Sequence, residues 1–132
     1  MKLAFIYFTY TKEIDILNLS LEAFDDNDMS NIYILDDVNN PLPYIPGKVI
    51  KDNYKQTSFK RNNNLNGIEC LDGMIQEYNR IMSIKNYDWV VKVDSDTFIN
   101  DFDMLKSIDT TKYNQFGTSN RYFYKIRNDI VI

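Results

Sequence analysis

Apolar and polar positions in the first third of the chain follow the pattern of a strand, a helix and a second strand. Lys2–Phe8 and Asn31–Leu35 are short, nearly continuous apolar runs, and each predicts a strand. Between them, apolar residues recur at helical spacing and predict one apolar helix face: Ile14, Leu17, Leu21 and Phe24. This order predicts two parallel strands joined by a right-handed crossover.

A loop and a second helix follow. Asn39–Gly47 contains three Pro residues and a Gly and predicts the loop, and Lys48–Ile50 is a candidate for a short third strand. Asn66 and Glu69 have the spacing of a capping box and predict the start of a helix. Its apolar face comprises Ile68, Leu71, Met74, Ile75, Tyr78, Ile81 and Met82.

Trp89–Val93 is an apolar run interrupted only by Lys92, and such runs are typical of strands that are buried on both faces of a parallel sheet. Beyond it, Asp101–Ile108 predicts a short helix and Lys112–Thr118 a further strand. The alternation of strands and helices predicts an α/β fold, a three-layer α/β/α sandwich with a mostly parallel sheet. A length of 132 residues fits one domain over residues 1–132.

The last apolar run stops at Asp94-Ser95-Asp96. Ligands of open α/β sheets bind at the carboxyl ends of the strands, and in a straight strand the two carboxylates would share one face. Together they can offer oxygen ligands to Mg²⁺ or Mn²⁺. The sequence therefore predicts a divalent-cation site with Asp94 and Asp96 as metal ligands.

Three alternatives compete for this motif. A calcium loop of the EF-hand type does not fit, because Phe98 and Ile99 occupy its fifth and sixth positions. A phosphatase motif of the haloacid-dehalogenase type fits poorly, because Thr97 comes one residue early. A solvated turn that merely begins with two acidic residues stays open, since short motifs often occur without function.

The residues around the motif resemble a known family. Trp89–Asn100 is similar to the segment that carries the Asp-x-Asp motif in the β-1,3-galactosyltransferase and Fringe-like enzymes, which have the GT-A fold. Ser95 stands where that family usually has a third Asp. The resemblance implies that a nucleoside-diphosphate sugar, most simply a UDP-sugar, binds through Mn²⁺ or Mg²⁺, with Asp94 and Ser95 near the nucleotide.

The same resemblance implies further donor-site residues. Residues at the ends of the first two strands would line the uridine pocket: Thr9, Tyr10, Asp36 and Asp37. Arg61-Asn62 resembles an Arg–Asn pair that precedes the corresponding helix in many GT-A enzymes, and the cation there would contact the diphosphate or the Asp that binds the ribose ring. The alternatives are a solvated end of a strand for the acidic pair and a solvated basic loop for Arg61 and Asn62.

Composition excludes several classes of function. A net charge of −4 and a pI near 4.7 argue against a nucleic-acid partner, which would call for a basic surface. The chain has no His, which excludes His acid–base catalysis and His metal ligands, and Cys70 is alone, so no disulfide forms within the chain. No apolar segment has the length of a membrane span, and Met1–Tyr10 lacks a signal-peptide cleavage site, so we expect a cytoplasmic protein.

The resemblance covers only a donor-binding half. In GT-A enzymes a C-terminal half supplies the acceptor site, and this chain shows no comparable set of residues after Asp96. Two hypotheses follow. The first is a compact metal-dependent glycosyltransferase with an unknown hydroxyl acceptor, and the second is a non-catalytic nucleotide-sugar-binding module or the donor fragment of a split or decayed enzyme. A catalytic residue cannot be assigned in either case.

Overall fold

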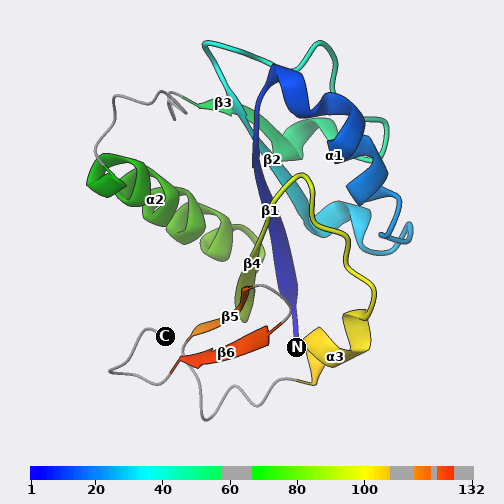
Figure 1. Cartoon of the computed structure of the whole chain (residues 1–132), viewed down its shortest axis with the longest axis vertical. Helices are drawn as coiled ribbons and strands as arrows, with labels where there is room; N and C mark the ends of the chain where they lie inside the picture. Colours follow the sequence, from blue (N-terminus) through cyan, green and yellow to red (C-terminus); the bar gives the residue numbers. More distant parts are fainter. Residues whose placement is uncertain (58–66, 108–114, 120–121, 127–132) are drawn as a thin grey trace. The chain divides into compact units, whose positions relative to one another are not determined.

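The computed structural model describes residues 1–57, 67–107, 115–119 and 122–126, with side chains described in 1–57 and 72–107. The chain divides into two compact units, Met1–Asn100 and Asp101–Ile132. The described elements of the first unit follow one another along the chain as strands, α-helices and short 3₁₀ helices (Figure 1). They are β1 (Leu3–Thr9), η1 (Thr11–Glu13), α1 (Ile14–Leu21), η2 (Met29–Asn31), β2 (Ile32–Asp37), η3 (Lys51–Asn53), β3 (Tyr54–Thr57), α2 (Gly67–Lys85) and β4 (Trp89–Val93).

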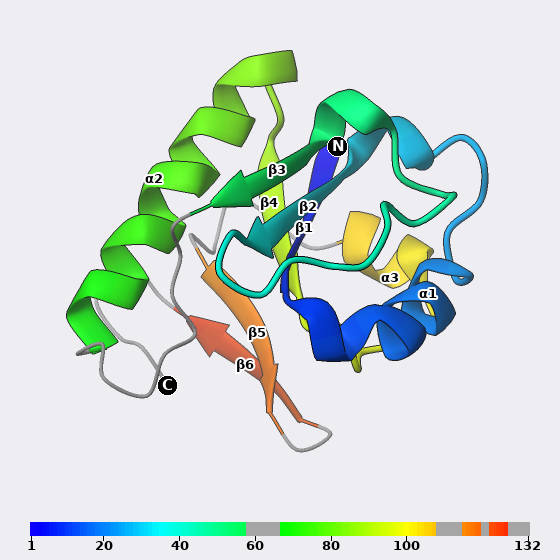
Figure 2. The ribbon, with the colours of Figure 1, turned by 90° about the horizontal axis from the view of Figure 1, so that it is seen from above.

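The strands of the first unit form one all-parallel sheet in the order β3-β2-β1-β4. In the register of this sheet Thr9 of β1 is the partner of Asp36 on β2, and Tyr7 is the partner of Val93 on β4. The helices α1 and α2 lie on opposite faces of the sheet (Figure 2). The predicted parallel sheet with helices is therefore confirmed, and the first unit has a mixed α/β fold.

The apolar face predicted for the first helix packs on one face of the sheet. Leu17 and Leu21 of α1 and the following Phe24 are buried, and Ile14 at the start of the helix is half-buried. The rings of Phe24 and Phe5 on β1 meet edge to face, with centroids 4.9 Å apart. Such aromatic pairs add to the free energy gained from burying their apolar surface, so this contact helps to fix α1 against the sheet.

The other face of the sheet packs against α2. Side chains alternate along a strand, so the residues of β1 that do not face α1 join the second core cluster. This cluster consists of Ala4, Ile6, Phe8, Tyr33, Leu35, Ile81 and Tyr87, with Met74, Tyr78, Met82 and Val90 packed against it. Ile75, which we expected on the apolar face of the helix, is 45% exposed because it lies at the rim of the apolar stripe. The side chains of Ile68 and Leu71 lie outside the described residues, and so does the predicted cap at Asn66.

A Schellman motif ends α2 and directs the chain into β4. Asn86 follows the helix with φ of 51°, a left-handed conformation that Asn tolerates better than most residues. The amide of Tyr87 donates to the carbonyl of Met82 over 3.3 Å, which is the long hydrogen bond of this motif. Met82 and Tyr87 also pack in one apolar cluster, so the sharp stop of the helix is fixed by both contacts.

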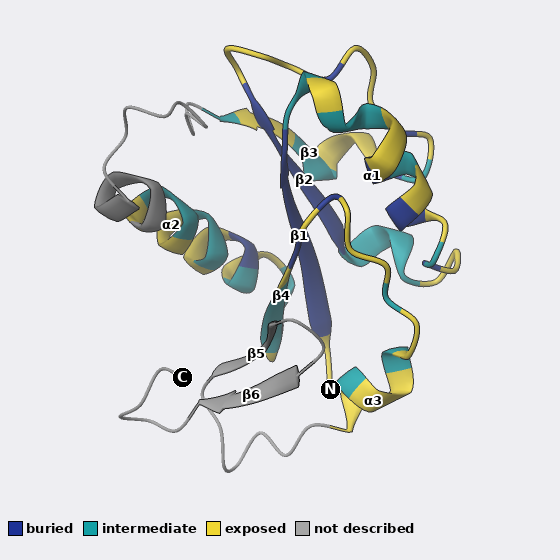
Figure 3. Ribbon diagram, viewed as in Figure 1, coloured by how far each residue is buried: buried dark blue, intermediate teal, exposed yellow. Residues whose placement is uncertain are grey.

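The expectation that Trp89–Val93 is buried on both faces is wrong. β1 and β2 are buried along their whole length, whereas in β4 only Val93 is buried and Lys92 is exposed (Figure 3). The helices cover the middle of the sheet, where β1 and β2 lie, more completely than the outer strand β4. An apolar run alone does not distinguish these two positions.

The third strand also differs from the prediction. Lys48–Ile50 is not a strand: the amide of Val49 donates to the carbonyl of Pro46 over 2.9 Å and closes a turn. The third strand is β3, whose partly exposed sequence Tyr-Lys-Gln-Thr pairs only with β2 among the described strands. Its polar side chains gave no apolar signal, because this strand lies at an edge of the sheet.

The described part of the second unit contains α3 (Phe102–Lys106) and an antiparallel pair, β5 (Gln115–Ser119) and β6 (Tyr122–Ile126). The side chain of Asp101 accepts the amide of Met104 over 2.9 Å and caps α3, so the predicted short helix is confirmed there. β5 covers the later part of the strand predicted at Lys112–Thr118. Within the described residues, no helix is long and apolar enough to cross a membrane.

Candidate functional site

The carboxyl ends of β1 and β4 lie side by side where the strand order of the sheet reverses. From β1 the chain adds β2 and β3 on one side, and α2 then leads it to β4 on the other side of β1. Ligands of open α/β sheets bind outside the carboxyl ends of the strands at such a position. The segments that follow β1 and β4 are therefore the candidate site.

The Asp94-Ser95-Asp96 motif forms a turn directly after β4. The amide of Thr97 donates to the carbonyl of Asp94 over 2.9 Å, which closes the turn. The expectation that the two carboxylates share one face of a straight strand is therefore wrong, because the strand ends at Val93. Asp94 and Asp96 are nevertheless both exposed, whereas Ser95 between them is buried with 2% of its surface exposed.

The side chain of Ser95 turns inward to the segment that follows β1. Its hydroxyl donates to Oε2 of Glu13 over 2.8 Å. The hydroxyl of Thr9, a residue with 2% exposure, donates to the same oxygen over 3.2 Å. Ser95, Thr9 and Glu13 therefore form a polar cluster under the turn, which we call the Glu13 cluster. Tyr10 lies beside it in an extended conformation and is half-buried.

A second contact holds the other side of the turn. The hydroxyl of Ser20 on α1 donates to the carbonyl of Thr97, and it lies 2.9 Å from the hydroxyl of Tyr7. Burial raises the pKa of Tyr7 to about 12. The phenol therefore stays protonated at neutral pH and can serve as a hydrogen-bond donor.

Asp94 points to the α2 side of the sheet. It forms an ion pair with Lys92, which precedes it on β4. Burial, and after it the negative charge of Asp94, raises the pKa of Tyr78 on α2 to about 12. Asp94 therefore lies close enough to α2 to influence its electrostatics, and a cation that binds Asp94 must compete with the ammonium group of Lys92.

Asp36 and Asp37 are fixed by the chain itself. Asp36 is fully buried; its Oδ1 accepts the amide of Asp37 over 2.9 Å, and its Oδ2 accepts the amide of Leu42 over 2.8 Å and the hydroxyl of Tyr54. Asp37 is 4% exposed and accepts the amide of Asn39 over 2.9 Å. Both carboxylates therefore hold the loop that follows β2, which lies next to the candidate site.

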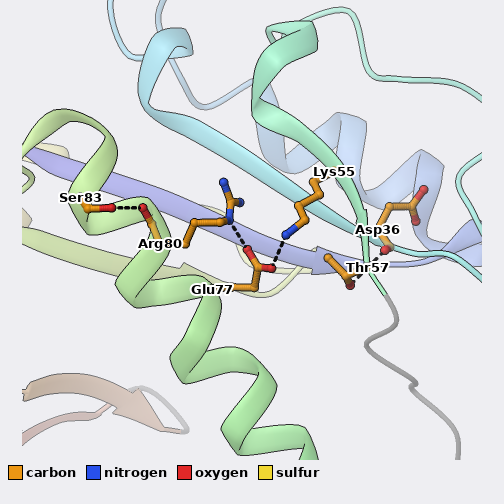
Figure 4. Close-up of polar contacts among 6 residues, drawn as sticks. All are labelled: Asp36, Lys55, Thr57, Glu77, Arg80 and Ser83. Carbon is orange, nitrogen blue, oxygen red and sulfur yellow. Dashed lines mark hydrogen bonds and ion pairs between the residues drawn. The ribbon is translucent and has the colours of Figure 1, made fainter.

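A charged cluster on the α2 side joins the edge strand β3 to the helix. Glu77 lies between Lys55 of β3, at 2.7 Å, and Arg80, at 2.6 Å (Figure 4). Burial alone would raise the pKa of Glu77, but the hydrogen bonds from Lys55 and Arg80 outweigh burial and hold this pKa below its usual value. Thr57, at the end of β3, donates its hydroxyl to the carbonyl of Asp36 over 3.3 Å.

The structure brings some of the predicted site residues together and separates others. Thr9 and Ser95 meet at the Glu13 cluster, whereas Asp36 lies on the α1 face of the sheet and Asp94 points to α2. Among the described residues no hydrogen bond joins the pair on β2 to the turn after β4. The predicted contacts of Arg61 and Asn62 lie outside the described residues.

Two residues of this region were not singled out from the sequence as site residues. Glu13 comes just before the predicted apolar helix face, where an acidic residue is common, and Ser20 lies on the buried side of α1, where a serine gives no functional signal. Their roles follow from contacts with residues 82 and 77 positions away along the chain. No local pattern of residues encodes such a contact.

The carboxylates of the described residues do not form a complete metal site by themselves. In that part of the chain no three acidic or Cys side chains are grouped so that they could hold a metal ion. Asp94 and Asp96 still offer two exposed oxygen donors on one turn, which suits a cation that takes its other ligands from water and a phosphorylated ligand.

The evidence for the function comes from the site, because no protein-family model, curated protein or solved structure matches this chain. The first unit is a mixed α/β fold with an all-parallel sheet.

Proposed function

We propose that the turn after β4 binds a nucleoside diphosphate through a divalent cation, in the manner of the donor site of a GT-A glycosyltransferase. One observation carries the proposal: two exposed carboxylates, Asp94 and Asp96, stand on a fixed turn at the carboxyl edge where the strand order reverses. The resemblance of Trp89–Asn100 to the β-1,3-galactosyltransferase and Fringe-like enzymes adds the identity of the ligand, a nucleotide sugar.

The chemistry of the two carboxylates suits Mn²⁺ or Mg²⁺. These cations prefer oxygen ligands and six-fold coordination, so two side chains leave positions for water and phosphate oxygens. When bound, the cation would offset the negative charge that develops on a departing diphosphate. In this proposal Asp96 is a direct ligand, and Asp94 reaches the cation or a water bound to it after leaving Lys92.

The remaining residues of the edge shape the nucleoside side of the site. Tyr10 follows β1 and is half-buried, so part of this residue is accessible to a ligand. Asp36 and Asp37 would act by holding the loop after β2, since their oxygens accept hydrogen bonds from the chain. This role differs from the direct contact with uridine that the family resemblance implies.

A non-catalytic nucleotide-sugar-binding module is the second candidate. Glu13, Asp36 and Asp37 all accept hydrogen bonds within the chain. Within residues 10–13, 38–40 and 94–97, which directly follow β1, β2 and β4, the exposed carboxylates are those of Asp94 and Asp96, and a cation would use both. A base for an acceptor hydroxyl would then have to come from elsewhere, which favours binding over transfer.

Calorimetry with UDP, with and without Mn²⁺, tests the proposal. We expect UDP to bind more tightly in the presence of Mn²⁺, and we expect Asp96→Asn to lose most of that gain. Asp26→Asn is the matched control, because Asp26 is exposed between α1 and β2, at the end of the sheet where the strands begin. Equal affinities with and without Mn²⁺, or an unchanged gain in Asp96→Asn, would refute the cation bridge.

A turnover assay separates the two candidates. The protein is incubated with UDP-sugars and GDP-sugars in the presence of Mn²⁺, and diphosphate release is measured with and without simple sugar acceptors. A binding module releases little diphosphate in either case. Release that one acceptor strongly stimulates would establish a transferase, for which positioning of the acceptor and a base contribute large factors in rate.

A further inference from the structure

Two buried serine hydroxyls hold the residues on both sides of Asp96. Ser95, which precedes it, donates to Oε2 of Glu13 over 2.8 Å, and the carbonyl of Thr97, which follows it, accepts the hydroxyl of Ser20. Ser95 and Ser20 are 2% and 3% exposed. Asp96 itself is exposed, so it lies between two residues that Glu13 and Ser20 hold by hydrogen bonds.

The hydrogen atoms available in these contacts define their direction. A serine has one hydroxyl hydrogen, and that of Ser20 goes to the carbonyl of Thr97, so Tyr7 must donate to the oxygen of Ser20. The order is therefore Tyr7 to Ser20 to Thr97. In the Glu13 cluster the turn is the donor and not the acceptor. The hydroxyl of Ser95 donates to a carboxylate oxygen of Glu13, which also accepts the hydroxyl of Thr9.

We propose that Glu13 and Ser20 are positioning residues for Asp96. They fix the turn from the α1 side of the sheet, so that the carboxylate of Asp96 faces outward before a cation arrives. A ligand that finds its contact already in place loses less conformational entropy on binding, and its affinity rises accordingly. This inference rests on the proposed function for the nature of the ligand and assigns two residues that contact neither the cation nor the nucleotide.

The Glu13 cluster also explains why a small hydroxyl suits position 95. A carboxylate at this position would lie against Oε2 of Glu13, which now accepts the Ser95 hydroxyl at 2.8 Å. Two like charges at hydrogen-bond distance repel each other, and position 95 is buried, so Ser95→Asp should displace the turn. Glu13→Gln removes one of the two charges, and the double variant should recover part of what Ser95→Asp loses.

The test compares Glu13→Ala, Ser20→Ala, Ser95→Asp and the double variant Glu13→Gln/Ser95→Asp in two measurements. The first is amide NMR of the ligand-free protein, which reports the turn through the shifts of residues 94–97 and hydrogen exchange of Thr97. The second is UDP affinity with and without Mn²⁺. Ser83→Ala is the matched control, because its exposed hydroxyl on α2 also donates to a backbone carbonyl, that of Arg80, over 2.7 Å (Figure 4).

We expect the shifts of the turn to change in Glu13→Ala and Ser20→Ala and to stay unchanged in Ser83→Ala. The gain in UDP affinity that Mn²⁺ provides should fall about three- to tenfold in the first two variants, the effect of losing one net hydrogen bond. The affinity without Mn²⁺ should be unchanged, which distinguishes positioning of Asp96 from a general loss of structure. Partial recovery of the Mn²⁺ gain in Glu13→Gln/Ser95→Asp would support the proposal further.

Two results would overturn the inference. Unchanged shifts of the turn in both Glu13→Ala and Ser20→Ala would show that these residues do not hold it. Altered shifts with an unchanged Mn²⁺ gain would show that the held conformation does not matter for the cation. If the parent protein gains nothing from Mn²⁺, the proposed function fails and positioning for a cation fails with it, while the NMR shifts still decide whether Glu13 and Ser20 fix the turn.

Discussion

Tyr54 on the edge strand β3 donates its phenolic hydrogen to Oδ2 of Asp36, a carboxylate with no exposed surface on the neighbouring strand β2. The same oxygen accepts the amide of Leu42 over 2.8 Å, so Asp36 joins an edge strand to the loop that follows β2. Burial raises the pKa of Tyr54, and the hydrogen bond to Asp36 raises it further. The phenol therefore stays a donor at neutral pH.

Tyr54→Phe should destabilise the protein by about 1–3 kcal/mol, because it removes one donor from a buried carboxylate. The free energy of unfolding is measured by urea denaturation at pH 7. Gln56→Ala on the same strand is the control, since its amide lies 3.4 Å from the Tyr54 oxygen and the residue is exposed. Equal losses in the two variants would show that the contact with Asp36 contributes little.

Two isoleucines of α2 should respond differently to the same truncation. Ile81 has no exposed surface and lies in the α2 core cluster, so Ile81→Ala should cost about 2–5 kcal/mol. Ile75 is 45% exposed, and Ile75→Ala should change stability by less than about 0.5 kcal/mol. Thermal or urea denaturation of both variants checks the prediction, and similar losses would contradict the burial that the structure assigns.

Stability should fall at alkaline pH. The phenols of Tyr7 and Tyr78 have their pKa raised by burial to about 12, whereas their ordinary value is 10.0. The folded chain therefore holds these protons more tightly, so the free energy of unfolding has its full value below pH 10 and falls as the pH rises from 10 to about 12. Urea denaturation at several alkaline pH values measures this slope. Tyr78→Phe should flatten it and Tyr44→Phe, at an exposed position, should not.

The ion pairs of Glu77 with Lys55 and Arg80 should contribute little to the free energy of unfolding, and only above acidic pH. The pKa of Glu77 is lowered in the folded chain. The stabilisation is therefore present above the ordinary pKa of 4.5 and is lost as the pH falls through the pKa of the folded state. Because Lys55 and Arg80 are 47% and 40% exposed, we expect Glu77→Gln to cost at most about 1 kcal/mol at pH 7, and less in high salt. Denaturation at pH 7 and pH 3 tests this, and an equal loss at both values would refute it.

The sequence predicts the parts of the fold in which burial leaves a regular pattern. β1 and β2 are apolar runs in the middle of the sheet, and α1 carries Leu17 and Leu21 at helical spacing, so their positions were predicted to within a few residues. α2 was predicted for the same reason. The parallel arrangement followed because short returns through a helix join parallel strands.

The sequence does not predict features that depend on distant partners. β3 is a polar edge strand, and its identity depends on its pairing with β2 and on the bond from Tyr54 to Asp36. The inward turn of Ser95 depends on Glu13, which lies at the start of another element. The motif itself could be found from spacing, but its conformation as a turn could not.

The place of β1 in the sheet has a consequence for synthesis. β1 leaves the ribosome before the other strands of this sheet, and its neighbour β2 is complete at residue 37, but its other neighbour β4 is complete only at residue 93. Until then one edge of Leu3–Thr9, a strand that is buried along its whole length in the folded chain, has no partner. Open apolar edges pair readily with other chains, so nascent chains that end before β4 are the most prone to aggregate. An amino-terminal fragment without β4 will therefore not serve as a substitute for the whole sheet.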